Sequence, residues 1–244
     1  GWRATGYRRH RRCGSVAQAI GSRRSWMKNM TKRRGLQKRT AEALQPLGFK
    51  AISGTRFTRQ VGEQLHFVGL QYGGSSRGFT FNLGCHFRGL PSMSDYQSVT
   101  LDDMEELDSG LRCRIGNYID DGFYDVWWDA NEAELGGALA QASWAIERAF
   151  DDCQAKWGDG KLLLQSHVKN RAGAFRWSRA FRRWTEFEGD FSRFAFAAVL
   201  AHRHGDKVLA RALYEKALLC KDSIIVPHVP KIAAALGIRK PRAG

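Results

Sequence analysis

The chain has no apolar run long enough to cross a bilayer. Its longest apolar stretch with helical character extends from Phe194 to Ala201, whereas a membrane-spanning helix needs about 20 residues. The N-terminal part also lacks the apolar segment of roughly 7–15 residues that a secretory signal requires. The five cysteines are odd in number and show no C-x-x-C spacing, which indicates reduced thiols rather than a disulfide framework. We therefore expect a cytoplasmic protein that is not inserted in a membrane.

Signatures of known catalytic and metal sites are missing as well. The sequence contains no H-E-x-x-H, no Walker loop, no G-x-S-x-G and no deaminase motif. Asp120, Asp121 and Asp125 do not have the spacing of a calcium loop. We therefore expect no metal and no cofactor, and a non-enzymatic role is favoured, although an active site assembled from scattered residues stays open.

Charge of both signs is present but segregated along the chain. The formal net charge is +15, yet residues 1–40 carry 13 basic side chains and no acidic one, and residues 95–134 carry 12 acidic and 2 basic side chains. Residues 1–29 are predicted to be a basic leader, disordered or untranslated, with Met27 and Met30 as alternative starts. If it is present, this basic arm is one candidate for contacting nucleic-acid phosphates.

Alternating apolar residues predict a sheet. Within Gly78–Phe87, the apolar side chains follow period two, which is typical of a strand with one buried face. Residues 64–72 and 49–58 have a similar character, and the Gly-rich residues 73–76 between the first of these and Gly78–Phe87 predict a hairpin. A helix is predicted over residues 36–47, ending near Pro46 with Gly48 as its left-handed cap.

The second half of the chain is predicted to be helical. Apolar positions recur with helical spacing from about residue 131 to 156, from 191 to 203, from 206 to 220 and from 231 to 236. The sequence therefore predicts an α+β fold, in which a small antiparallel sheet is preceded by a helix and followed by a helical C-terminal half. We divide it into an α+β domain over residues 30–155 and a helical extension over residues 156–244 that packs on it.

The order of short motifs resembles a known family. Leu47-Gly48-Phe49 is followed by Asn82-Leu83-Gly84, by Cys113-Arg114-Ile115-Gly116 and by the Trp127-Trp128 pair. Over roughly residues 36–150 this order resembles the bacterial domain-of-unknown-function 4304 family. The resemblance implies a small cytoplasmic α+β domain and implies no particular active site.

The acidic middle of the chain is the leading candidate for a binding site. We expect it to form an acidic face that binds a protein, with a Trp as an anchor. Its residues are Asp102, Asp103, Glu105, Glu106, Asp120, Asp121, Asp125, Trp127 and Trp128. The partner would itself be basic, and one concrete form of this hypothesis is an immunity-like protein that neutralises a basic toxin or nuclease.

Three further sets of residues are weaker candidates. Arg112 and Arg114 should share one face of a strand, where they either pair with carboxylates or hold an anion. A helical stripe can contact nucleic acid, and a pocket can form around two histidines and an asparagine. The stripe is Arg176, Arg179 and Arg183, and the pocket is His66, Asn82 and His86.

Overall fold

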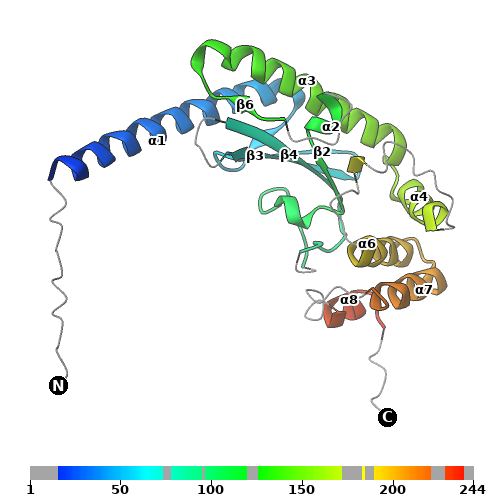
Figure 1. The fold of residues 1–244 in the computed structure, drawn as a ribbon. Coiled ribbons are helices and arrows are strands. Elements are labelled where there is room, and N and C mark those ends of the chain that lie inside the picture. The colour runs from blue at the N-terminus through cyan, green and yellow to red at the C-terminus, as the bar shows by residue number, and fades with distance from the viewer. Residues whose placement is uncertain are drawn as a thin grey trace, which may run out of the picture.

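The computed structural model describes residues 16–73, 78–94, 97–119, 126–171, 183–184, 190–220 and 229–238. Over these residues the chain forms a helix, then a six-stranded antiparallel sheet, then a helical half (Figure 1). The predicted α+β class is confirmed. No helix in these ranges combines the length and the apolar character that crossing a bilayer would demand.

The first helix, α1 (Val16–Leu44), is longer than the sequence predicted. Residues 16–29, which the sequence assigned to a leader that is disordered or untranslated, belong to this helix, and the stretch contains no proline and several strong helix formers. Its C-terminal end was predicted correctly, since a short 3-10 turn, Gln45–Leu47, follows and Gly48 adopts the left-handed conformation with φ 81°. The buried side chains of α1 recur every four residues, at Leu36, Thr40 and Leu44.

The sheet contains four longer strands and two strands of two residues each. The strands are β1 (Lys50–Ala51), β2 (Arg56–Val61), β3 (Gln64–Tyr72), β4 (Gly78–Phe87), β5 (Leu111–Arg114) and β6 (Trp128–Asp129). Their order is β1-β2-β3-β4-β5, and β6 pairs with β4 beyond the end of β5. The strand predicted over residues 49–58 is divided into β1 and β2, because the chain turns between them and Ile52 N–H bonds to the carbonyl of Arg56.

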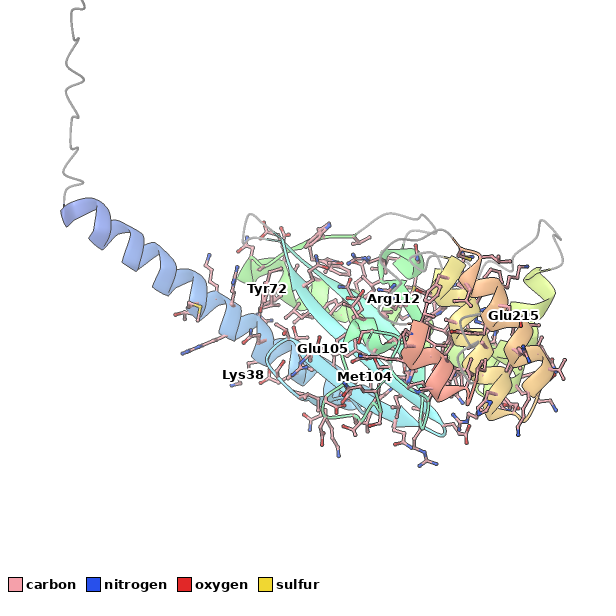
Figure 2. All side chains as sticks on the ribbon, turned by 90° about the horizontal axis from the view of Figure 1, so that it is seen from below. Lys38, Tyr72, Met104, Glu105, Arg112 and Glu215 are labelled. Atoms are coloured by element: carbon pink, nitrogen blue, oxygen red, sulfur yellow. The ribbon has the colours of Figure 1, made fainter. Side chains whose placement is uncertain are left out.

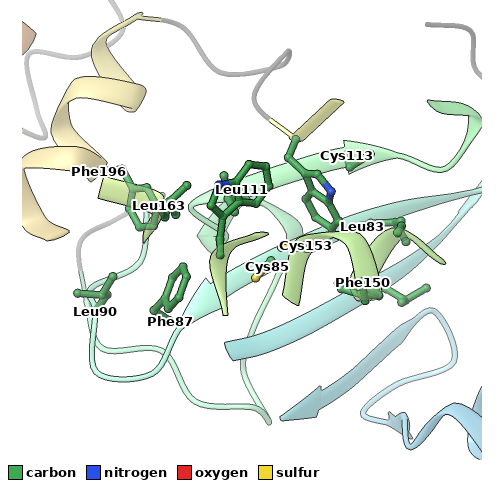
Figure 3. Close-up of a cluster of buried hydrophobic side chains, with 14 of the residues drawn as sticks. Leu83, Cys85, Phe87, Leu90, Leu111, Cys113, Phe150, Cys153, Leu163 and Phe196 are labelled. Carbon is green, nitrogen blue, oxygen red and sulfur yellow. The ribbon is translucent and has the colours of Figure 1, made fainter. Parts of the chain in front are cut away.

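One face of the sheet is covered by α1 and by α3 (Glu132–Trp157). Figure 3 shows Leu83 and Cys85 of β4 in the same buried cluster as Phe150 and Cys153 of α3. Burying each large apolar side chain here contributes about 1.5–3 kcal/mol to the free energy of unfolding. This core determines the register of β4, since a shift by one residue would turn Phe79 and its neighbours to the other face.

The C-terminal helices pack at one end of the sheet (Figure 1). They are α4 (Gly160–Arg171), α6 (Asp190–Arg203), α7 (Lys207–Leu218) and α8 (Val229–Ala235). Phe196 of α6 lies so close to Gly110 that a Cβ there would meet the ring at 2.0 Å. Arg203 of the same helix donates to a carboxylate oxygen of Glu63 at 3.1 Å and to the carbonyl of Arg88 at 2.7 Å.

A long connection between β4 and β5 crosses the other face of the sheet. It includes the 3-10 turn η2 (Glu106–Asp108), and it buries Met104 against Leu65 and Phe67. Gly84 permits this close approach, because a Cβ at that position would lie 2.1 Å from Oγ of Ser109. The short helix α2 (Gly116–Ile119) then leads away from β5.

Candidate functional site

A shallow groove of about 310 Å³ lies on the part of the sheet that neither α3 nor the C-terminal helices cover. Its lining combines the floor of the central strands with a wall from the crossing connection. The lining residues are Thr55, Arg56, Phe67, Gly69, Leu70, Gln71, Asn82, Glu105, Glu106 and Leu107. In the view from below, Met104, Glu105 and Arg112 lie on this face (Figure 2). We refer to this uncovered part of the sheet as the open face.

The floor of the groove is polar. Asn82 of β4 donates to Oε1 of Gln71 on β3 at 3.0 Å, and the Arg114 guanidinium of β5 donates to the same oxygen at 2.8 Å and also to Oδ1 of Asn82. Both bonds go to Oε1 of Gln71. The NH2 group of the same side chain makes no hydrogen bond to any residue that the structure describes. Gln71, Asn82 and Arg114 thus form one hydrogen-bonded unit across β3, β4 and β5.

Arg112 and Arg114 do share one strand face, as the sequence predicted. They pair in register with Gly84 and Asn82 of β4, while Cys113 between them is buried on the opposite side. The partners of Arg114 include the side-chain amides of Gln71 and Asn82. This arrangement helps to build the floor of the groove.

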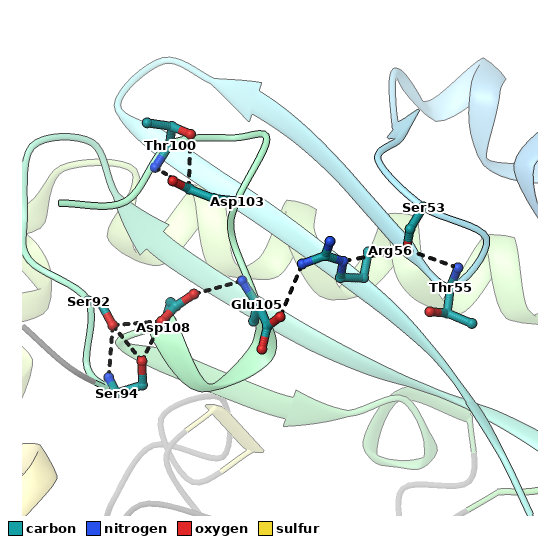
Figure 4. A network of polar contacts seen from close by, with 9 residues as sticks. All are labelled: Ser53, Thr55, Arg56, Ser92, Ser94, Thr100, Asp103, Glu105 and Asp108. Carbon is teal, nitrogen blue, oxygen red and sulfur yellow. Dashed lines mark hydrogen bonds and ion pairs between the residues drawn. The ribbon is translucent and has the colours of Figure 1, made fainter. Parts of the chain in front are cut away.

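The wall of the groove is held by Asp108. Its Oδ1 accepts hydrogen bonds from the hydroxyls of Ser92 and Ser94, both at 2.6 Å, and its Oδ2 accepts one from the backbone N–H of Glu105 at 2.8 Å (Figure 4). Hydrogen bonds to a carboxylate are stronger than those between neutral groups. Asp108 therefore fixes the conformation of the acidic segment.

Two of the predicted acidic residues also have structural partners. Oδ1 of Asp103 accepts from the N–H and hydroxyl of Thr100, at 2.7 and 2.9 Å, and these bonds lower the pKa of the carboxyl group. Glu105 forms an ion pair of 3.1 Å with Arg56 of β2 (Figure 4). Asp103 thus stabilises the connection between β4 and β5, and Glu105 holds this connection on the sheet.

The other two predicted acids in this segment remain available. Asp102 is exposed and Glu106 is half-buried, and neither carboxylate bonds to another residue in the part of the chain that the structure describes. Between Glu106 and Asp108, Leu107 exposes 58% of its surface. The rim of the groove therefore presents the Glu106 carboxylate beside an exposed apolar side chain, and Asp102 adds a second carboxylate in the same segment.

The two tryptophans lie on opposite sides of the sheet. Trp128 is only 9% exposed, stacks on Phe79 with ring centroids 5.7 Å apart, and donates to Gln141 at 2.9 Å. Trp127 is 41% exposed, and Cβ atoms at Gly73 and Gly78 would each lie 3.4–3.6 Å from its ring. These glycines are in phase with Gln71 and Asn82 along their strands, so the Trp127 ring lies on the open face.

The predicted pocket of His66, Asn82 and His86 is not formed. His66 lies on the helix-covered face, where it stacks on Phe150 of α3 at 4.2 Å, whereas Asn82 and His86 belong to the open face. The error has a simple cause: residues 66 and 82 belong to different strands, and their relative phase depends on a register in which Asn82 pairs with Gly69.

Both histidines are buried in structural roles. Arg59 donates to Nδ1 of His66 at 3.1 Å, and Nε2 of His66 therefore donates to Gln64 at 2.8 Å. Burial, and then the nearby Arg59 charge, lower the pKa of His66 to about 3. His86 bonds through Nε2 to the carbonyl of Leu90 at 3.1 Å, and burial lowers its pKa to about 4.

Several predicted residues cannot be placed on this face. Asp120, Asp121 and Asp125, and also Arg176 and Arg179, lie outside the described residues. Arg183, the third member of the predicted stripe, places its guanidinium 4.7 Å from the centre of the Tyr118 ring. Among the described ranges, no three His, Cys, Asp or Glu side chains are grouped so as to hold a metal ion.

Sequence reasoning did not identify Arg56, Gln71 or Leu107 as groove residues. For Gln71 a signal existed, because it alternates in phase with Leu65 and Phe67 but is polar, which marks the end of the covered part of β3. For Arg56 and Leu107 no local signal existed. Their place depends on how the connection between β4 and β5 crosses the sheet.

Comparison with known proteins finds one family. Residues 40–151 match a domain of unknown function, DUF4304, and neither a curated protein nor a solved structure matches the chain. The match runs from the last turns of α1 into α3 and contains the whole sheet and the groove, while α4, α6, α7 and α8 follow it. This match agrees with the family suggested by the ordered motifs: residues 40–151 match the domain of unknown function DUF4304.

Proposed function

We propose that this chain is a non-enzymatic module that binds a basic protein through the open face of its sheet. The observation that carries the proposal is the groove itself, which is lined by the exposed Leu107 and by Glu106, whose carboxylate has no partner among the described residues. Asp102 adds a second such carboxylate in the same acidic segment. A lysine or arginine of the partner would meet these carboxylates. Complementary charge accelerates association and excludes partners of the wrong sign.

Aromatic and apolar groups on the same face supply the anchors. Trp127 lies on the open face beyond Gln71, and Leu107 projects from the opposite wall. Tryptophan is enriched among the few residues that carry most of the binding energy of an interface. A standard interface buries about 800 Å² on each partner, so the groove would form its centre and the rim carboxylates its edge.

The proposed absence of catalysis is supported by the positions of the histidines. His66 and His86 are held in hydrogen bonds to Gln64, Arg59 and Leu90, and burial keeps both rings neutral. A general base must reach a substrate, and the rings of these two residues are covered by protein.

We further propose a cytoplasmic location in a bacterium and an immunity-like role against a basic toxin or nuclease.

The test begins by capturing partners of the full chain from lysate, with and without nuclease, and by measuring the affinity of a stoichiometric partner by calorimetry. The informative variant is Asp102→Lys with Glu106→Lys. These carboxylates make no hydrogen bond within the described chain, so the variant should fold normally. Its matched control is Glu134→Lys with Glu147→Lys, which makes the same change in charge on the exposed side of α3.

We expect the rim variant to lose at least tenfold in affinity and the α3 control to bind like the unmodified protein. Thermal unfolding of both variants should match the parent within a few degrees. Equal affinity of the rim variant and the parent would refute the open face as the binding site. Capture of no protein that survives nuclease treatment would refute the protein-binding proposal.

A further inference from the structure

A second charged surface lies on α1, away from the open face. The side chains of α1 are described from Met30, and between that residue and Leu44 the helix carries Lys32, Arg33, Arg34, Lys38 and Arg39 against a single acid, Glu42. All five basic side chains are exposed. Figure 1 shows the N-terminal part of α1 extending beyond the body of the protein.

The helical period places Arg34 and Lys38 away from the body. Leu36, Thr40 and Leu44 form the buried stripe of α1. Lys38 is two residues from both Leu36 and Thr40, which is about 200° around the helix, and Arg34 is one turn before Lys38 on the same outer side. Lys32 is four residues before Leu36 and so lies in line with the buried stripe, but its own side chain is exposed. We call Lys32, Arg34 and Lys38 the basic ridge.

Little within the described structure neutralises the basic ridge. Lys38 and Glu42 are 3.8 Å apart in an exposed i, i+4 pair, which contributes only about 0.3–0.5 kcal/mol in helices. Arg33 is on the body side instead, with its guanidinium 4.8 Å from the centre of the Tyr72 ring. The residues of α1 before Met30 add Arg23, Arg24 and Lys28 and no acid.

We propose that the basic ridge of α1 binds the phosphate backbone of a nucleic acid. Arg34 and Lys38 are one helical turn apart, so their Cβ atoms are about 5–6 Å from one another, and cations carried on one rigid helix release condensed counterions when they lie along a polyphosphate. The contact reads no bases, because Lys and Arg held at the backbone position a protein without reading sequence. This surface is distinct from the acidic rim and does not depend on the function proposed for it.

An anionic membrane is the competing partner, and the geometry disfavours it. A helix that lies in a bilayer interface needs an apolar face to insert. On α1 the apolar stripe of Leu36 and Leu44 is buried against the protein, and only the charged side is presented. The basic ridge therefore contacts phosphates at a surface rather than inserting among acyl chains.

The test measures fluorescence anisotropy of a fluorescein-labelled 25-base-pair DNA duplex of mixed sequence with the full chain at 50 and 200 mM salt. With about three phosphate contacts, this fourfold rise in salt should lower affinity by roughly 40-fold. Lys32→Glu, Arg34→Glu and Lys38→Glu together should weaken binding at 50 mM salt at least tenfold and make the salt dependence shallower. The control is Lys161→Glu, Lys207→Glu and Arg211→Glu, which makes the same charge change on exposed positions of α4 and α7.

The control variant should retain most of the affinity, and circular dichroism should show both variants folded. An equal loss in the two variants would attribute binding to net charge and overturn the assignment to α1. Unchanged binding by the ridge variant would overturn it as well. So would binding to vesicles containing phosphatidylserine without binding to the duplex, because the partner would then be a membrane surface.

Discussion

The Arg59 guanidinium donates a hydrogen bond of 3.1 Å to Nδ1 of His66, and this contact fixes the histidine as its neutral Nε2–H tautomer. Arg59 also donates to the carbonyl of Leu47 at 2.6 Å and lies 4.6 Å from the Phe49 ring centre. Through these contacts a charged side chain joins the end of α1 to β2 and β3. It also makes protonation of His66 unfavourable, which gives stability a pH dependence.

We expect the protein to lose stability as the pH falls below about 6.5. The folded pKa of His66 is about 3 and that of His86 about 4, both below the ordinary value of 6.5. The unfolded chain therefore binds protons first, and each such histidine costs about 1.4 kcal/mol per pH unit between its two pKa values. Urea unfolding at pH 7.5, 6 and 5 measures the slope.

The variant His66→Asn tests this assignment. Asparagine keeps an acceptor for Arg59 but cannot be protonated, so the variant should be less stable at pH 7.5 and should depend less steeply on pH. His204→Asn, at an exposed position, is the control and should follow the parent curve. A His66→Asn slope as steep as that of the parent would show that the acid sensitivity arises elsewhere.

Gly84→Ala should displace the connection that forms the wall of the groove. A Cβ at Gly84 would lie 2.1 Å from Oγ of Ser109 and 2.9 Å from its Cβ. Overpacking of this kind costs about 1–3 kcal/mol, which urea unfolding would detect. The same substitution at Gly35, where a Cβ meets nothing within 4 Å, should instead stabilise α1 by about 0.5–1 kcal/mol.

A second substitution tests whether the contact with Ser109, rather than a general effect on β4, causes the loss of stability in Gly84→Ala. Ser109→Gly removes both atoms that the new methyl group would meet, so adding it to Gly84→Ala should restore much of the lost stability. Failure of the rescue would place the strain in the sheet rather than between the sheet and the connection.

Asp108→Asn should loosen the acidic segment. The substitution replaces one of two acceptor oxygens that together receive three hydrogen bonds, from Ser92, Ser94 and the Glu105 N–H. Hydrogen bonds to a charged group contribute about 1.5–3 kcal/mol each, so a loss of that order is expected. Limited proteolysis should then cleave near residues 97–108 faster than in the parent, whereas Asp102→Asn should leave the rate unchanged.

The two adjacent tryptophans should respond in opposite ways to truncation. Trp128→Ala removes a buried ring and its bond to Gln141, and it should cost about 3–5 kcal/mol. Trp127→Ala removes a ring on the open face, so it should change stability little and weaken binding of the protein partner. Similar losses of stability in both variants, measured by urea unfolding, would contradict their placement on opposite faces.

The sequence by itself determined the central strands, the end of the first helix and the resemblance to the family. Period-two alternation within Gly78–Phe87 and over residues 64–72 is a local property, and the strands begin and end there. Gly48 ends the first helical segment because its left-handed conformation strongly favours glycine. The sequence also shows which side chains share one face of a strand, as Arg112 and Arg114 do. Side chains alternate between the two faces of any strand, whatever strand it pairs with.

Only the tertiary structure decided what meets across strands and connections. Sequence reasoning joined His66 with Asn82 and His86, but the pairing of Asn82 with Gly69 turns His66 to the opposite face. The groove likewise depends on the connection that brings Glu105 to Arg56, 49 positions away in the chain. Register and chain crossing depend on the packing of the whole core, and no local pattern of residues encodes them.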